Sequence, residues 1–146
     1  MKHLLTALTL VCCLALTAPV WAATQTFGPD FSRFTVEVPD GWTAKANDGG
    51  CQITSADEGS SVSIQVAKNG GKSAAELVKL IGDNLGGKIV KTENDGPNQS
   101  TIYAEIDGVK VAVMVFVDGD KFAAFTMAGS DTDTMQKIAG SLQDAK

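Results

Sequence analysis

The chain has 146 residues, with 12 lysines and arginines against 17 aspartates and glutamates, one histidine, three cysteines and fifteen glycines. This length corresponds to about one domain, and a net charge of −5 without a basic cluster argues against nucleic-acid binding. Because the one histidine is His3, the body of the chain offers no base for a catalytic triad of the Ser-His-Asp or Cys-His kind.

Residues 1–22 have the pattern of a secretory signal peptide. A short basic start precedes an apolar run over residues 4–18, and Val20-Trp21-Ala22 provides a signal-peptidase site. The run is shorter than the roughly 20 residues that span a bilayer. We therefore expect cleavage after Ala22, or after Ala23, and no stable membrane span afterwards.

The predicted mature domain comprises residues 23–146, a single domain with 11 basic and 17 acidic residues and no histidine. Val11 precedes Cys12, so the two neighbouring cysteines do not form a typical lipoprotein box. The predicted location is the periplasm of a Gram-negative cell, with secretion beyond it as the alternative.

Four short strands are expected before the first helix, after a polar leader over 23–32 that we expect to be extended and poorly fixed. Alternating apolar residues and turn signals place these strands at 33–38, 42–46, 51–55 and 61–67. A capping box at Ser73-Ala74-Ala75-Glu76 and an apolar stripe then predict a helix over 73–85, with Gly86-Gly87 as its stop.

Four more strands and a second helix follow. The strands are expected at 88–93, 100–106, 109–117 and 121–128, with hairpin turns at Asp107-Gly108 and Asp118-Gly119. Ser130-x-x-Asp133 is expected to begin the final helix. The predicted fold is therefore α+β and sandwich-like, with an antiparallel sheet of about six to seven strands packed against two helices in the order ββββ-α-ββββ-α.

The strand at 109–117 is apolar on both of its faces. Valines occupy its odd positions, and Ala112, Met114 and Phe116 lie among its even positions. Such a strand is either central and covered twice, or it meets a partner on one face. Met114 and Phe116, if exposed, are candidate partner- or ligand-binding residues.

Two further residues are candidates for function. Trp42 follows the Pro39-Asp40-Gly41 turn, where an indole either plugs the end of the sheet or serves as an exposed anchor. Cys51 is the one cysteine of the mature domain and hence a free thiol, which is either buried as a small hydrophobic residue or functional between chains. The sequence favours the plug and the buried thiol.

No metal or cofactor site is expected. Asp118-Gly119-Asp120 and Asp131-Thr132-Asp133 each pair two carboxylates, but neither belongs to a calcium loop, and turn and helix-start chemistry explains them. The carboxylates also single out no catalytic pair, so we expect no catalytic residues.

The motif Phe34-x-Val36-x-Val38-Pro39-x-Gly41-Trp42, followed by this order of strands and helices, resembles the PsbP-like/DcrB-like superfamily. That superfamily includes a eukaryotic Ran-binding nuclear-import factor. The resemblance covers nearly all of residues 27–144. It implies an antiparallel sheet packed against helices and a binding or accessory role without an active site, as in photosystem assembly, phage uptake or GTPase regulation.

These features predict an exported, periplasmic, non-enzymatic binding or accessory protein that docks on an envelope protein or a small ligand. One alternative is a small envelope enzyme that uses carboxylates or Cys51. Another is a structural homodimer that buries the open face of the strand at 109–117.

Overall fold

The computed structural model describes residues 22–146, so the predicted signal peptide, apart from Ala22, lies outside the described residues. Ten strands and two helices follow one another along this part of the chain. They are β1 (Ala23–Phe27), β2 (Phe34–Val38), β3 (Thr43–Asn47), β4 (Gly50–Thr54), β5 (Ser60–Lys68), α1 (Ala74–Asn84), β6 (Lys88–Asn94), β7 (Gln99–Ile106), β8 (Val109–Asp118), β9 (Lys121–Gly129), α2 (Thr132–Gly140) and β10 (Gln143–Asp144).

The strands form two antiparallel sheets. The larger has seven strands in the order β3-β4-β5-β9-β8-β7-β6, and the smaller has three in the order β1-β2-β10. The predicted α+β class and its sheet of six to seven strands are confirmed. The three-stranded sheet was not predicted, because β1 and β10 carry few apolar side chains.

The expectation that residues 23–32 are poorly fixed is wrong for their first half. Residues 23–27 pair with β2 from Ala23 opposite Val38 to Phe27 opposite Phe34. The Phe27 side chain is buried, and its ring centroid lies 6.3 Å from that of Phe34. A single buried aromatic residue therefore anchors a strand that is otherwise polar and exposed.

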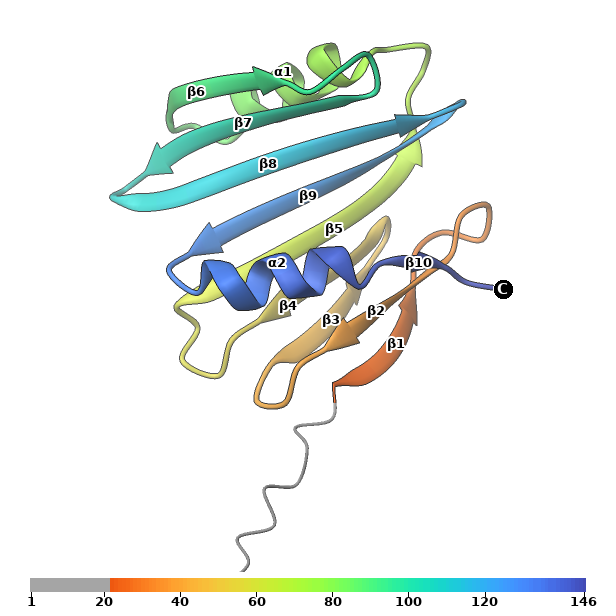
Figure 1. The fold of residues 1–146 in the computed structure, drawn as a ribbon, viewed down its shortest axis with the longest axis vertical. Coiled ribbons are helices and arrows are strands. Elements are labelled where there is room, and N and C mark those ends of the chain that lie inside the picture. Colours follow the sequence, from red (N-terminus) through yellow and green to blue (C-terminus); the bar gives the residue numbers. More distant parts are fainter. Residues whose placement is uncertain (1–21) are drawn as a thin grey trace, which may run out of the picture.

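The two helices cover opposite faces of the seven-stranded sheet, as Figure 1 shows. We call these the α1 face and the α2 face. On the α1 face, α1 packs on β7 and β8. On the α2 face, α2 contacts β5 and β9, and the three-stranded sheet lies beside it.

Each face has its own buried core, because alternate residues of a strand point to opposite sides. The α1-face core includes Val111, Val113 and Val115 of β8. The α2-face core is made by side chains of both sheets and of α2, including Phe34, Val36, Cys51, Ile53, Val62, Ile64, Phe125, Met127, Met135 and Ile138.

The first predicted helix is confirmed, and the start of the second is corrected. Ser73 and Glu76 form the expected capping box of α1, with Ser73 N–H donating to Glu76 Oε2 at 2.8 Å. In α2, by contrast, the N-cap is Asp131 rather than Ser130, since the Asp131 carboxylate accepts from Thr134 N–H at 3.2 Å.

The predicted hairpin turns are confirmed at one position and displaced at the other. Ile106 pairs with Val109, so Asp107-Gly108 forms the two-residue loop between β7 and β8 as expected. Between β8 and β9, Asp118 pairs with Lys121, which makes Gly119-Asp120 the loop rather than Asp118-Gly119.

Gly129, at the end of β9, lies against the loop before β5, two residues before the N-cap of α2. It pairs with Ser60 of β5, and Ser60 Oγ accepts a hydrogen bond from Asp131 N–H at 3.0 Å. A Cβ added at Gly129 would lie 2.2 Å from the carbonyl oxygen of Gly59 and 2.6 Å from Ser60 Cα. Only glycine therefore permits this close approach between the end of β9 and the loop before β5.

We expect G129A to lower the free energy of unfolding by about 2 kcal/mol more than G96A, because only the former adds overpacking against backbone. Gly96 is a matched control, since its φ of +119° is close to the +118° of Gly129 and its added Cβ would meet no atom within 4 Å. Urea denaturation followed by tryptophan fluorescence would measure both variants. Equal losses of stability in the two variants would show that the structure accommodates a Cβ at Gly129 without overpacking.

Candidate functional site

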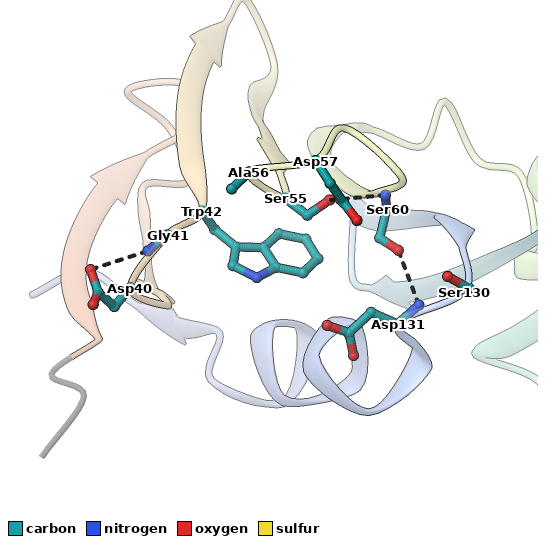
Figure 2. Close-up of a pocket in the computed structure, with 9 residues that line it drawn as sticks. All are labelled: Asp40, Gly41, Trp42, Ser55, Ala56, Asp57, Ser60, Ser130 and Asp131. Carbon is teal, nitrogen blue, oxygen red and sulfur yellow. Dashed lines mark hydrogen bonds between the residues drawn. The ribbon is translucent and has the colours of Figure 1, made fainter. Parts of the chain in front are cut away.

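Trp42 lies at one end of the molecule, in a shallow pocket with a volume of about 340 Å³. The pocket is formed by the turn before β3, the loop between β4 and β5, and the start of α2 (Figure 2). The backbone N–H of Trp42 donates to the carbonyl oxygen of Pro39 at 3.1 Å, and the half-buried indole packs against the α2-face core. This packing is what the plug interpretation of Trp42 requires.

The polar groups around Trp42 are engaged in holding the surrounding loops. Ser55 Oγ donates to Asp57 Oδ1 at 2.6 Å, and Gly59 N–H donates to the same oxygen at 2.9 Å. Both bonds lower the pKa of Asp57 below its usual value, and the bond from Ser55 has the larger effect. The bond from Asp131 N–H to Ser60 Oγ then ties this loop to α2 (Figure 2). The pocket is thus a junction of three segments, and its geometry has a structural explanation.

A larger and more apolar groove lies beside α2 on the α2 face, over β7, β8 and β9. Its volume is about 540 Å³, within the range of sites that bind small molecules. We call it the α2 groove and define it by six of the residues that line it: Val90, Tyr103, Met114, Met127, Met135 and Gln136.

The α2 groove exists because each helix covers only part of the sheet. Val111, Val113 and Val115 of β8 point to the α1 face and are buried beneath α1, whereas on the α2 face α2 contacts β5 and β9. Met114 is therefore half-buried on the open part of the α2 face, and its neighbour Phe116 is 37% exposed. The apolar α2 face of β8, noted in the sequence, is thus partly uncovered.

The structure does not bring the three candidate surface residues into one site. Trp42 lines the pocket at the end of the molecule, and Met114 lines the α2 groove. Phe116 lies in a separate small cavity of about 120 Å³, and its ring packs edge-on against Phe125 at 5.8 Å between centroids.

Sequence reasoning missed most of the groove. Val90 and Tyr103 line it and are 66% and 40% exposed, and Met127 and Met135 contribute from β9 and α2. The available signal was the outward position of Tyr103 in the alternation of 100–106. The exposure of Val90 was not predictable, because it follows from a register shift between Ile89 and Lys91.

Tyr103 is held at the rim of the groove by charged neighbours on β6. Its hydroxyl donates to Glu93 Oε2 at 3.1 Å, and Lys91 forms an ion pair with Glu93. The hydrogen bond from Lys91, followed by that from Tyr103, lowers the pKa of Glu93 below its usual value. Desolvation, followed by the bond to Glu93, raises the pKa of Tyr103. The phenol therefore remains neutral at physiological pH and presents an apolar ring with a fixed hydroxyl.

Cys51 is a free thiol in the α2-face core, on β4, and its side chain is 0% exposed. Burial raises its pKa to about 11. Since the thiolate is the reactive form, this environment suppresses thiol chemistry, as the buried interpretation of Cys51 expects.

We expect Cys51 to react with a disulfide reagent at pH 8 only after the protein is unfolded by denaturant. Because the pKa is raised in the folded protein, the thiol favours folding below pH 9 and this contribution is lost as the pH rises towards 11. Absorbance of the released thiolate would measure the rate in native and denatured protein. Rapid labelling of native protein would contradict the buried assignment.

The acidic residues and helices add no further site. Within residues 22–146, no group of three or more histidine, cysteine, aspartate or glutamate residues is arranged to hold a metal ion. Neither α1 nor α2, the two helices of these residues, is long and apolar enough to cross a membrane.

The fold and the site together define the class of this protein: a two-sheet α+β sandwich with an apolar groove on one face of the larger sheet. Among solved structures, the chain is similar to the solution structure of cyanobacterial PsbP (CyanoP) from Synechocystis sp. PCC 6803. The TM-score is 0.58 at 11% identity, with 85% of this chain and 94% of that chain covered. This similarity confirms the predicted PsbP-like fold and concerns the fold alone; the DcrB-like part of the resemblance stays a prediction.

No family model matches the sequence, and no curated protein matches it.

Proposed function

We propose that the chain is an exported, periplasmic, non-enzymatic accessory protein that docks on an envelope protein through the α2 groove and its rim. The observation that carries this proposal is the apolar part of the seven-stranded sheet that the fold leaves uncovered beside α2. An exposed apolar surface of this kind is typical of an interaction site.

The exposed residues around the groove favour a protein partner. Val90 and Tyr103 stand on β6 and β7, and β6 is an outer strand of the sheet, so its outer edge is available to a partner chain. Large exposed side chains beside an apolar groove provide the mixture of aromatic and aliphatic contacts that protein interfaces use. A carboxylate- or thiol-dependent enzyme receives less support, because Cys51 is buried and Asp57 and Asp131 stabilise loops and helix ends.

Site-specific photo-crosslinking in intact cells tests the docking surface. A photoreactive amino acid in place of Val90 is expected to crosslink one envelope protein. The same residue in place of Gln65 is expected to give no such product, because Gln65 is exposed on the opposite face of the sheet. Mass spectrometry would identify the products.

Three other outcomes would contradict the docking proposal. Equal crosslinking from positions 90 and 65, or none from either, would remove the support for a specific surface. A product made of two copies of this chain would instead indicate the homodimer.

Export is tested by processing. We expect the protein recovered from the periplasmic fraction to begin at Ala23, or at Thr24 if cleavage follows the second alanine. The first of these sites leaves all five residues of β1 in place. Intact mass and N-terminal sequencing would measure the start. An unprocessed chain in the cytoplasmic fraction would contradict the export proposal.

A further inference from the structure

All three methionines of residues 22–146 line the α2 groove. Met114 comes from β8, Met127 from β9 and Met135 from α2. The fourth methionine of the chain, Met1, lies outside the described residues. Three distant positions in the sequence thus supply the same chemical group to one cavity.

The fold brings these three side chains to the same groove. Met127 pairs with Ala112, and Met114 pairs with Phe125, so Met114 and Met127 are diagonal neighbours on the α2 face of adjacent strands. Met135 is in the first turn of α2, which packs on β9, and its side chain is 2% exposed. Met127 is 9% exposed and Met114 half-buried, so the set extends from the buried floor to the open groove.

Thioether sulfur is a soft, neutral donor that selects soft metal ions, above all Cu(I). It binds through a lone pair and has no proton to lose, in contrast to cysteine, histidine and carboxylate ligands. Hard ions such as calcium and magnesium require oxygen donors, which the apolar floor of this groove does not supply.

The residues that line the groove include no cysteine or histidine that could compete with the thioethers for a metal ion. Residues 22–146 contain no histidine, and Cys51 is fully buried on β4 and does not line the groove. Glu105 and Lys110, which do line it, stand opposite each other across β7 and β8 and leave the rim without net charge. An uncharged donor set with a balanced rim suits a monovalent ion better than a divalent one, because the uncompensated charge is smaller.

We propose that the sulfur atoms of Met114, Met127 and Met135 bind Cu(I) or its redox-inert congener Ag(I). Each sulfur donates one electron pair to the ion; no covalent bond of the protein breaks, no proton is released and the oxidation state of the metal is unchanged. This inference rests on the proposed role of the α2 groove as a binding site. It specifies soft monovalent metal ions as the ligands of the groove floor.

Silver titration of purified protein labelled at the methionine methyl groups tests the proposal. We expect the methyl signals of Met114, Met127 and Met135 to shift together and to saturate at one Ag(I) per chain. If Met1 is retained, its signal is an internal control that stays in place. Independent shifts at different silver concentrations, or no shift, would overturn the shared site.

Variants separate the thioethers from other donors. M114L, which conserves side-chain volume at a half-buried position, is expected to weaken Ag(I) binding at least tenfold while thermal unfolding stays close to wild type. L80M adds an exposed thioether on α1 to the protein and is expected to bind no second ion. C51A must bind as wild type does; loss of binding in C51A would assign the ion to the thiol and overturn the proposal.

The pH dependence provides a further criterion. Affinity for Ag(I) is expected to be the same at pH 5.5 and pH 7.5, since thioethers do not titrate. An affinity that rises with pH would show that a protonated group is the ligand. Because the titration uses purified protein alone, its failure leaves the crosslinking result untouched, and a missing envelope partner leaves the metal site untouched.

Discussion

The position of β9 between β5 and β8 is the constraint on which the rest of the structure depends. Alternate residues of this one strand enter both cores, with Ala124 buried in the α1-face core and Phe125 and Met127 in the α2-face core. The pairing thereby joins two half-sheets that are covered on opposite faces. A shift of β9 by one residue would exchange these side chains between the faces and uncover both cores.

Covering opposite halves on opposite faces has a necessary consequence for the site. Neither helix spans the whole width of the seven strands, so each face keeps one open part. On the α1 face the open part lies over β3, β4 and β5 and carries polar side chains such as Ser63 and Gln65. On the α2 face it lies over β6, β7 and β8 and includes the mostly apolar α2 groove. The difference in polarity between the two open parts identifies the α2 groove as the unusual surface.

The sequence was sufficient for the regular elements and insufficient for their assembly. Alternation and the Ser73 capping box predicted the strands and α1 because each signal is local. β1 was not predicted because a single buried residue, Phe27, holds it in place, and Phe27 makes this contact with a residue of another strand. The cap of α2 was misplaced by one residue because Ser130 and Asp131 are both good caps, and the bond from Asp131 N–H to Ser60, 71 positions away, distinguishes them.

The groove was within reach of sequence reasoning only in part, and β8 shows why. Its apolar residues on both faces indicated a strand that is either covered on both faces or open to a partner on one of them. Which of these holds depends on where α2 lies. The composition of the two faces carries additional information. The buried α1 face of β8 uses the stiff, branched residues Val111, Val113 and Val115, whereas the open face uses Ala112, Met114 and Phe116.

Branched side chains suit a fixed core because their rotamers are restricted, and methionine suits a surface that adapts to a ligand because its thioether chain is flexible and polarisable. The change from valine to methionine between the two faces of β8 therefore coincides with the change from the face covered by α1 to the partly open face. Met127 and Met135 belong to the α2-face core and also line the groove, so three separate elements contribute a methionine to it.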